Sequence, residues 1–432
     1  MSDLHIDGDR LERRINDLAT IGPIEGGGSC RLALTDEDRD GRDLVVAWMT
    51  DLGLDISMDG IGNVVGVRPG RTDGAPIMTG SHIDTVRTGG RFDGNLGVLA
   101  GLEVIETLEF NGITTEHPFA VAFFTDEEGA RFQPDMLGSL VYAGGMGLEE
   151  ALDVVGIDGA VLGEELDRIG YRGTSPCPGF APRAFVELHV EQGPVLEADG
   201  VTIGAVTGVQ GISWTELAIT GQSNHAGTTP MDLRHDPGYV AALIASYVRQ
   251  MAIRMGGRQV ATVGSLELHP NLVNVVAGSA TMTVDLRNTD EALLVEAEAD
   301  LARFVAEAAA AEGVTVAERT LARFQPVAFD DRVVDTVAAV AAELGHSVKR
   351  LPSGAGHDAQ MMARLCPTGM VFVPSRDGIS HNPAEYTEPD DLVAGADVLL
   401  GSMLALDAMD LSTTGAPGGS GGASTDGAKG AP

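Results

Sequence analysis

The chain has 432 residues, enough for two or three domains at ~100–200 residues each. Hydrophobic residues make up 44% and charged residues 21%, a balance typical of a globular chain that buries a core. No stretch approaches the ~18 apolar residues of a membrane span, and the N-terminus lacks the basic and apolar regions of a secretory signal. We therefore expect a cytoplasmic protein.

The charge balance is strongly acidic, with 28 basic against 63 acidic residues and a net charge of −35. Nucleic acids and anionic membranes need a basic footprint, so neither is expected as a partner. Lysine occurs only at Lys349 and Lys429. A GC-rich genome alone explains arginine in place of lysine but not the acidic excess. A halophilic cytoplasm explains both, because high salt screens the repulsion between carboxylates.

In chain order, residues 11–53 are expected to form helices joined by a glycine-rich loop. From Ile61 onward, short apolar runs alternate with amphipathic stretches such as 97–108, a pattern typical of buried strands and covering helices in an α/β domain. The expected strands are residues 63–67, 76–80, 119–124, 185–190 and 370–374.

The stretch from 214 to 325 differs, because its apolar residues alternate in period two over 216–220 and 282–286. Two long amphipathic helices are expected at 235–254 and 291–311. This α+β set is inserted before the α/β pattern resumes near Val327. The predicted organisation is a discontinuous catalytic domain of mixed sheet flanked by helices (1–213 and 327–411), an inserted lid domain (214–326) and a flexible Gly/Ser-rich tail (412–432).

Candidate metal ligands begin at the end of the run 76–80. His82 and Asp84 lie two residues apart on one side of an extended chain, so the Asp84 carboxylate is expected to orient the His82 imidazole. Asp93 follows in a glycine-rich loop, where glycine lets the backbone approach a bound species. The alternative for Asp93 is a turn that uses it as a cap.

Two further strands are also followed by polar groups. Glu127 and Glu128 come after the apolar run 119–124, where ligands of open α/β sheets lie, and one can bind a metal while the other acts as a general base. A solvated acidic loop is the alternative. His189 lies near the end of the next strand, and His381 lies in a later loop.

Together the imidazoles and carboxylates suffice for two divalent ions bridged by an aspartate. The predicted ligands are His82, Asp93, Glu128, His189 and His381. Nitrogen and oxygen ligands suit Zn, Mn, Co or Ni. The cysteines Cys30, Cys177 and Cys366 form no CxxC pair, so a thiolate site is not expected.

The motifs GSHID, FDG, DEEG, ELHVEQGP, NHAGTTP and GISHNPAE, in this order, resemble the metal-dependent amidase branch of the M20 peptidase family. That branch contains N-carbamoyl-L-amino acid amidohydrolases, β-ureidopropionases and allantoate amidohydrolases. The resemblance extends from about residue 10 to residue 408. HVEQGP is its most specific element, because the aminopeptidase and deacylase branches usually have a carboxylate where His189 stands.

The resemblance implies two divalent ions per subunit, with zinc favoured over Mn, Co or Ni. One ion would be held by His82 and His189, the other by Glu128 and His381, with Asp93 bridging both. Glu127 matches the general base. We expect His357 and Asp358 to support the site from behind its ligands, and the alternative is that they bind substrate.

The resemblance also implies roles around the substrate, a small-molecule carboxylate. His225 matches a lid residue that stabilises the tetrahedral intermediate and touches substrate, and Asn274 matches a polar substrate contact. Arg287 matches a clamp on the substrate carboxylate, and Gln192 a residue near the ureido end. From the residues alone, Arg287 fits a surface arginine and His225 a loop cap. Residues 132–135 follow the Glu pair and are candidates for substrate selection.

The sequence therefore predicts a hydrolase of linear amide C–N bonds. The leading substrates are N-carbamoyl-L-amino acids or N-carbamoyl-β-alanine, cleaved to amino acid, CO2 and ammonia, and the alternative is an allantoate amidohydrolase. A non-catalytic relative is disfavoured by Glu127 beside a full ligand set, and a peptidase by His189. The resemblance further implies a homodimer formed through the lid, with lid residues that reach the partner's active site.

Overall fold

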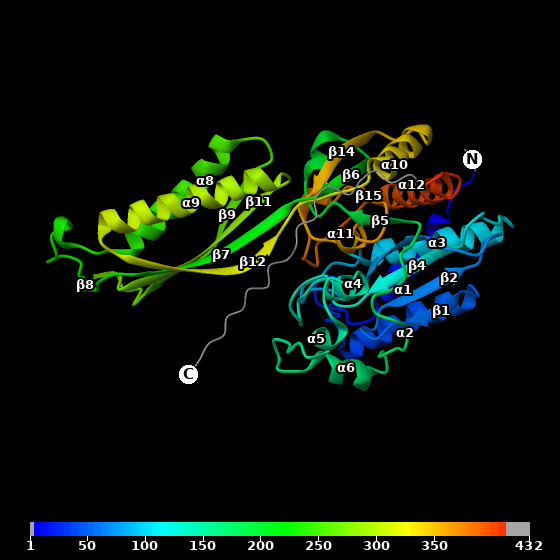
Figure 1. The fold of residues 1–432 in the computed structure, drawn as a ribbon, viewed down its shortest axis with the longest axis horizontal. Coiled ribbons are helices and arrows are strands. Elements are labelled where there is room, and N and C mark those ends of the chain that lie inside the picture. The colour runs from blue at the N-terminus through cyan, green and yellow to red at the C-terminus, as the bar shows by residue number, and fades with distance from the viewer. Residues whose placement is uncertain (1–3, 412–432) are drawn as a thin grey trace.

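The computed structural model describes residues 4–411, so the predicted tail at 412–432 lies outside the described residues. The chain forms a large lobe around a nine-stranded mixed sheet and a smaller, elongated lobe around a four-stranded sheet (Figure 1). This arrangement confirms the predicted α/β fold with a mixed, helix-flanked sheet. No helix within residues 4–411 has the length and apolarity needed to cross a membrane.

The large sheet runs in the order β1-β2-β4-β3-β5-β15-β6-β13, with β14 paired to β6. Strands β4, β3, β5 and β15 run parallel to one another, and the outer pairs β1–β2 and β6–β13 are antiparallel. The central strands are buried at every residue, as expected of parallel strands covered on both faces. The strands are β1 (Asp55–Met58), β2 (Val64–Arg68), β3 (Ile77–His82), β4 (Phe119–Phe124), β5 (Ala184–Val190), β6 (Ile203–Val209), β13 (Val327–Ala328), β14 (Val348–Ser353) and β15 (Thr368–Val373).

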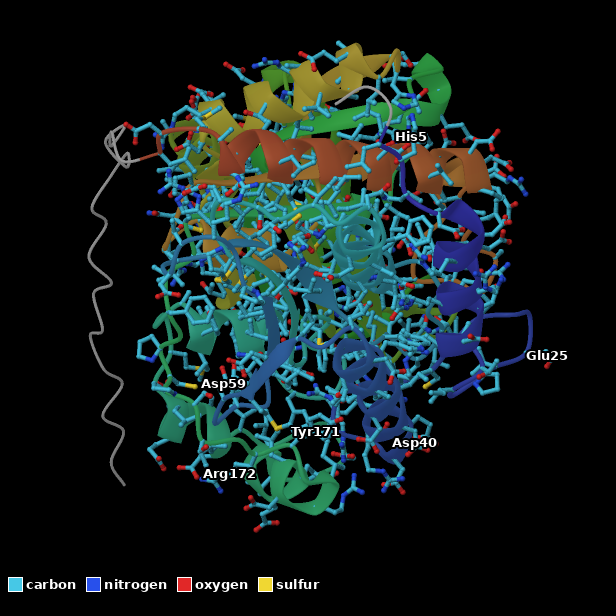
Figure 2. All side chains as sticks on the ribbon, turned by 90° about the vertical axis from the view of Figure 1, so that its right-hand side faces the viewer. His5, Glu25, Asp40, Asp59, Tyr171 and Arg172 are labelled. Carbon is cyan, nitrogen blue, oxygen red and sulfur yellow. The ribbon has the colours of Figure 1, made fainter. Side chains whose placement is uncertain are left out.

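The helices of the large lobe cover this sheet. Helix α3 packs against β3, β4, β5 and α12, and its residues from Asn95 to Ile105 are all buried. The N-terminal segment lies on α12, where His5 Nδ1 is 2.7 Å from Asp397 Oδ2 (Figure 2). The helices are α1 (Gly8–Leu18), α2 (Asp36–Asp51), α3 (Asn95–Phe110), α4 (Leu137–Tyr142), α5 (Leu148–Leu152), α6 (Leu162–Ile169), α7 (Val195–Asp199), α10 (Asp331–Glu343), α11 (Asp358–Met362) and α12 (Pro389–Asp407).

A buried arginine of α2 fixes this helix to the edge of the sheet that carries the candidate site. Arg42 Nε lies 2.8 Å from Asp38 Oδ2, and both side chains are fully buried. The same guanidinium donates to the carbonyl of Gly62 and to Oγ1 of Thr125, the residue that directly follows β4. Arg42 thus holds the backbone from which the acidic run 126–128 begins.

The smaller lobe has the sheet order β12-β7-β11-β9, and α8 and α9 pack against the same sheet and each other. Asp236 and Asp290 cap the two helices by accepting from backbone N–H groups of their first turns. A separate two-stranded ladder, β8–β10, lies at the far end of this lobe (Figure 1). The elements are β7 (Gly211–Thr220), β8 (Asn224–His225), α8 (Pro237–Met255), β9 (Val260–His269), β10 (Val275–Val276), β11 (Ser279–Asn288), α9 (Glu291–Glu312) and β12 (Thr315–Phe324).

Two neighbouring strands join the lobes. The chain enters the smaller lobe along β7 and leaves along β12, and the two are hydrogen-bonded from Thr220↔Thr315 to Ile212↔Phe324. Gln210 lies just before β7, and its backbone N–H and side-chain Nε2 donate to Ser353 and Gly354 of the large lobe. The lobes therefore meet at one narrow, paired connection.

Candidate metal centre and active site

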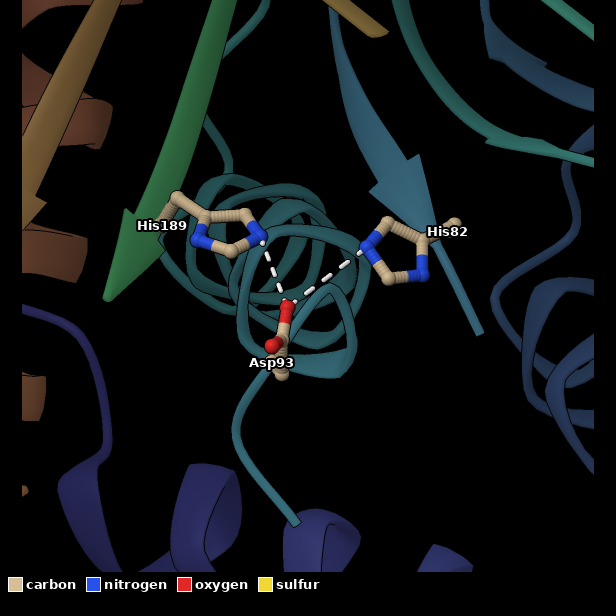
Figure 3. Close-up of side chains that lie close together, drawn as sticks. All are labelled: His82, Asp93 and His189. Carbon is tan, nitrogen blue, oxygen red and sulfur yellow. Dashed lines mark ion pairs between the residues drawn. The ribbon is translucent and has the colours of Figure 1, made fainter. Parts of the chain in front are cut away.

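The candidate ligands come together because their strands are neighbours. His82 is the last residue of β3, Glu127 and Glu128 follow β4, and His189 is the penultimate residue of β5. The strands β4, β3 and β5 are adjacent and parallel, so their carboxyl ends meet at one edge of the sheet. Figure 3 shows His82 and His189 pointing toward Asp93 from two such strands.

Asp93 stands between two sets of ligands. Its Oδ1 is 3.3 Å from His189 Nε2 and 3.7 Å from His82 Nε2, whereas its Oδ2 is 3.5 Å from His381 Nε2. Gly94 follows with a φ of 65°, and a Cβ there would lie 2.4 Å from the His82 ring. Only glycine permits this close approach of the loop to the imidazole.

Backbone carbonyls orient the two buried imidazoles. His82 Nδ1 is 2.9 Å from the carbonyl oxygen of Asp84, and His189 Nδ1 is 2.9 Å from that of Val190. A carbonyl only accepts, so each Nδ1 donates a proton to it and each Nε2 faces Asp93, where a bound cation would take the place of a proton on Nε2.

The Asp84 carboxylate differs from the expectation that it orients His82. It is 3.9 Å from His82 Nδ1 and instead accepts the backbone N–H groups of Glu127 (3.2 Å) and Glu128 (3.3 Å). The reason is that two backbone N–H groups lie within reach of the buried Asp84 carboxylate, whereas Nδ1 of His82 already donates to a backbone carbonyl. Asp84 therefore positions the Glu pair.

The second ligand set adds Glu128 and His381 to Asp93. His381 Nε2 is 3.2 Å from Glu128 Oε2. The side chain of Glu128 is 6% exposed and that of His381 is half exposed, so this set faces the opening of the site. Two clusters of imidazole and carboxylate donors that share one carboxylate fit a pair of divalent cations.

A third cluster of potential ligands is formed by Glu187, His189 and His357. Its members already have protein partners, since Glu187 accepts from Ser81 Oγ at 2.7 Å and His357 Nε2 is 2.8 Å from Ser353 Oγ. The His357 ring packs edge-on against His189 with centroids 4.6 Å apart. These contacts favour a supporting role for His357, which holds His189 in place.

The pKa values of two carboxyl groups of the site, Asp93 and Glu127, are shifted in opposite directions. Burial raises the pKa of Asp93, but the hydrogen bond and charge of His189 outweigh it and hold that pKa well below its usual range. Burial, with Asp358 and Glu128 nearby, raises the pKa of Glu127 well above its usual range. Glu127 Oε2 lies 3.4 Å from His82 Nε2. Glu127 thus stands beside the two candidate ligand sets without belonging to either, the position that a proton-transferring carboxyl group requires.

Gln192 also contacts this cluster. Its Nε2 donates to Asp93 Oδ2 at 2.9 Å, and its backbone N–H donates to Ser375 Oγ. The other end of the amide, Oε1, is buried without a hydrogen-bond partner among the described residues. A buried acceptor without a partner is available to accept an N–H from a bound molecule.

The residues assigned to the smaller lobe divide into two groups. Arg287, on β11, donates to the carboxylate of Asp285 through Nε and Nη2 and reaches the large lobe through Nη1, 2.7 Å from the Gly354 carbonyl. His225 and Asn274 are exposed on the far end of the lobe, in and beside the β8–β10 ladder (Figure 1). Within one protomer they are not brought to Asp93.

One contributor was missed from the sequence. Glu385 is buried, and its Oε1 accepts the backbone N–H groups of Phe92 (3.0 Å) and Asp93 (3.1 Å). It therefore ties the loop of His381 to the loop of Asp93. Its signal was available, because Glu385 ends the same GISHNPAE motif that supplies His381.

A buried cluster of imidazole and carboxylate donors beside a separate carboxyl group defines the class of metal-dependent hydrolases. Residues 78–405 match the peptidase family M20/M25/M40. The chain belongs to this family, which confirms the resemblance found in the sequence and the prediction of a hydrolase.

Two relatives and one solved structure are similar to this chain over nearly its whole length. An N-carbamoyl-L-amino-acid amidohydrolase of Rhizobium meliloti is 41% identical over 92% of this chain and 96% of its own. An enzyme of the same name from Geobacillus stearothermophilus is 39% identical over 91% and 97%. A hydantoinase/carbamoylase family amidase of Burkholderia multivorans has a TM-score of 0.92 and 46% identity, covering 94% of this chain and 99% of its own.

Proposed function

We propose that the protein is a metal-dependent amidohydrolase that cleaves N-carbamoyl-L-amino acids to the free amino acid, CO2 and ammonia. The observation that carries this proposal is the Asp93 carboxylate shared by two ligand sets, with Glu127 at their edge. The names of the relatives supply the substrate class. Allantoate, which has the same ureido group and a carboxylate, has less support because those relatives are named for N-carbamoyl amino acids.

The chemistry divides between the metal ions and the chain. Two divalent cations, when bound, would polarise the carbamoyl carbonyl and acidify water. Glu127 accepts a proton from the attacking water and donates it to the amino nitrogen that leaves. Asp84 keeps Glu127 in place through its backbone N–H. The products are the amino acid and carbamate, which decays to CO2 and ammonia.

Two side chains recognise the ends of the substrate in this proposal. The unpartnered Oε1 of Gln192 accepts an N–H of the ureido group. The carboxylate binds the remaining N–H groups of Nη1 and Nη2 of Arg287, since Asp285 occupies the Nε–Nη2 side and the Gly354 carbonyl accepts one N–H of Nη1. Asp285 thereby holds the guanidinium in one orientation.

The donor set supports zinc as the native metal, with Mn, Co or Ni as alternatives. His82 and His189 offer imidazole nitrogen, whereas Glu128 and Asp93 offer carboxylate oxygen. A metal-dependent activity screen of the chelator-treated protein distinguishes these ions. The ion that restores the highest kcat/KM at equal occupancy would be assigned.

We also propose a homodimer in which residues 214–326 form the lid and place His225 and Asn274 in the partner's site. Exposed apolar side chains surround these residues at the tip of the lobe, where Met231, Leu233 and Leu272 are 58–76% exposed and Val273 is fully exposed. Such a patch is typical of a protein interface. The exposure of His225 supports a role outside its own protomer.

The net charge of −35 supports a further proposal, that the enzyme works in the cytoplasm of a halophile. High salt would screen the repulsion among its carboxylates. Activity and stability should then rise as salt approaches molar concentration. Full activity and an unchanged Tm in dilute buffer would exclude this proposal.

The test of the main proposal is ammonia release by metal-loaded protein in high salt, with Glu127→Gln as the control. N-carbamoyl-L-amino acids, N-carbamoyl-β-alanine and allantoate are offered side by side. Preference for a carbamoyl amino acid supports the proposal. Activity on allantoate alone would move the enzyme to the alternative, and absence of activity on all three would exclude both.

A further inference from the structure

Asp135 lies on a loop that returns to the catalytic carboxyl group. The chain leaves the acidic run after Glu128, and the N–H of Met136 donates to the carbonyl of Glu127 at 2.7 Å. Met136 has a φ of 55°, a left-handed conformation that turns the chain into α4. Asp135 therefore stands one residue from a direct backbone contact with Glu127.

The other side of Asp135 faces the loop between β14 and α11 of the large lobe. A Cβ on Gly356 would lie 3.7 Å from Asp135 Oδ2, an ordinary contact distance, so the carboxylate and this loop are neighbours. Two residues earlier, the Gly354 carbonyl accepts from Arg287. Burial raises the pKa of Asp135, and the positive charge of Arg287 is near enough to offset part of that increase. Asp135 is thus a neighbour of both Glu127 and Arg287.

The carboxylate of Asp135 is half-buried and lacks a matching donor. Among residues 4–411, no other residue donates a hydrogen bond to the Asp135 carboxylate. Its charged form is stabilised by its own backbone N–H and by the positive charge of Arg287. By contrast, Asp84 and Glu385 each accept two backbone N–H groups. A half-buried carboxylate has lost part of its hydration, and a bound N–H donor would replace the water that it has lost.

We propose that Asp135 selects substrates whose side chain carries an N–H donor, either cationic or amide-like. The inference rests on the proposed function, in which the carbamoyl group lies at Asp93 and the carboxylate at Arg287. The rest of the substrate then lies beside Asp135. An N–H donor there would pair with the carboxylate, whereas a second substrate carboxylate would be repelled.

The test compares kcat/KM for four N-carbamoyl-L-amino acids, those of arginine, asparagine, leucine and aspartate. The wild-type enzyme should prefer the arginine and asparagine compounds over the leucine compound by ~10–100-fold, with the aspartate compound lowest. A larger value for arginine identifies a cationic side chain, and equal values identify a neutral donor.

The variant Asp135→Asn removes the charge and keeps the size. It should lower the preference for arginine over leucine by ~10-fold or more and raise activity on the aspartate compound, because the repulsion is gone. Asp153→Asn is the matched control, since Asp153 is an exposed carboxylate on the same lobe. It should leave the order of the four substrates unchanged.

The outcomes separate this inference from the function on which it rests. A wild-type enzyme that prefers the leucine compound, or an Asp135→Asn variant with the wild-type order, overturns the role of Asp135 and leaves the amidohydrolase standing. Absence of hydrolysis of every N-carbamoyl compound overturns both. The wild-type comparison decides the matter even if the variant fails to fold.

Discussion

The two lobes handle their polar groups in opposite ways. In the large lobe, His82, Asp93 and His189 are 1–3% exposed and each is held by at least one hydrogen bond or ion pair. In the small lobe, His225 and Asn274 are exposed beside apolar residues that are themselves exposed. The candidate metal ligands are thus enclosed and held within the large lobe, whereas the end of the small lobe leaves its polar and apolar side chains exposed.

The largest effect is expected where the large lobe does its chemistry. Glu127→Gln should lower kcat by ~10²–10⁴-fold or more, because the amide cannot accept the proton from water. The metal content should stay at the wild-type level, since Glu127 belongs to neither ligand set built around Asp93. Steady-state kinetics and elemental analysis check this, and near-normal turnover would remove Glu127 from the mechanism.

The buried ion pair provides the next contrast. Arg42→Met should lower the free energy of unfolding by ~3–5 kcal/mol, because Asp38 is left charged, buried and unpaired. The comparison is Arg303→Ala in the small lobe, which breaks surface ion pairs with Asp300 and Glu307 and should leave Tm unchanged. Denaturant titration of both variants tests the difference. Equal stabilities would show that Arg42 contributes nothing beyond a surface pair.

A smaller effect is expected at the junction of the lobes. Arg287→Lys should raise KM by ~10-fold or more with little change in kcat, because a point charge replaces the planar fork that binds a carboxylate. Arg319→Lys, on an exposed strand of the same sheet, serves as the control. A fall in kcat at constant KM would place Arg287 in the chemical step instead.

The smallest expected effect tests the proposal that His225 of one copy acts in the active site of a second copy. His225→Ala and Glu127→Gln should each be inactive alone, but a refolded equimolar mixture should recover about a quarter of wild-type activity, since half the dimers are mixed and each has one intact site. Recovery of no activity in a mixture proven to be dimeric would place His225 in its own protomer's site.

The sequence predicted the buried elements well. Strands 119–124 and 185–190 were found within a residue of their ends, because continuous apolar runs of that length admit few alternatives. The ten-residue strands β9 and β12 were missed. They are the edges of the small sheet, and most of their residues are exposed or half-buried, so they carry little hydrophobic period.

The site shows the same limit. The ligand residues were recognisable from their motifs, and the structure brings His82, Asp93, Glu128, His189 and His381 together. The role of the Asp84 carboxylate was predicted incorrectly, because the competing backbone N–H groups of residues 127 and 128 come from another strand. Residues 132–135 were named from the sequence as candidates for substrate selection, but the contacts of Asp135 and of Glu385 lie between distant loops, which residue spacing does not encode.

The paired strands between the lobes form a stiff connection. Because β7 and β12 are hydrogen-bonded along their length, a rotation of the lobe about Gln210 and Phe324 would move it as one stiff body. Ten residues of strand extend ~33 Å, so each degree of swing displaces the far end by ~0.6 Å. The position of His225 therefore depends on a few residues at this connection, which touch no substrate. Substitutions there should alter catalysis at a distance.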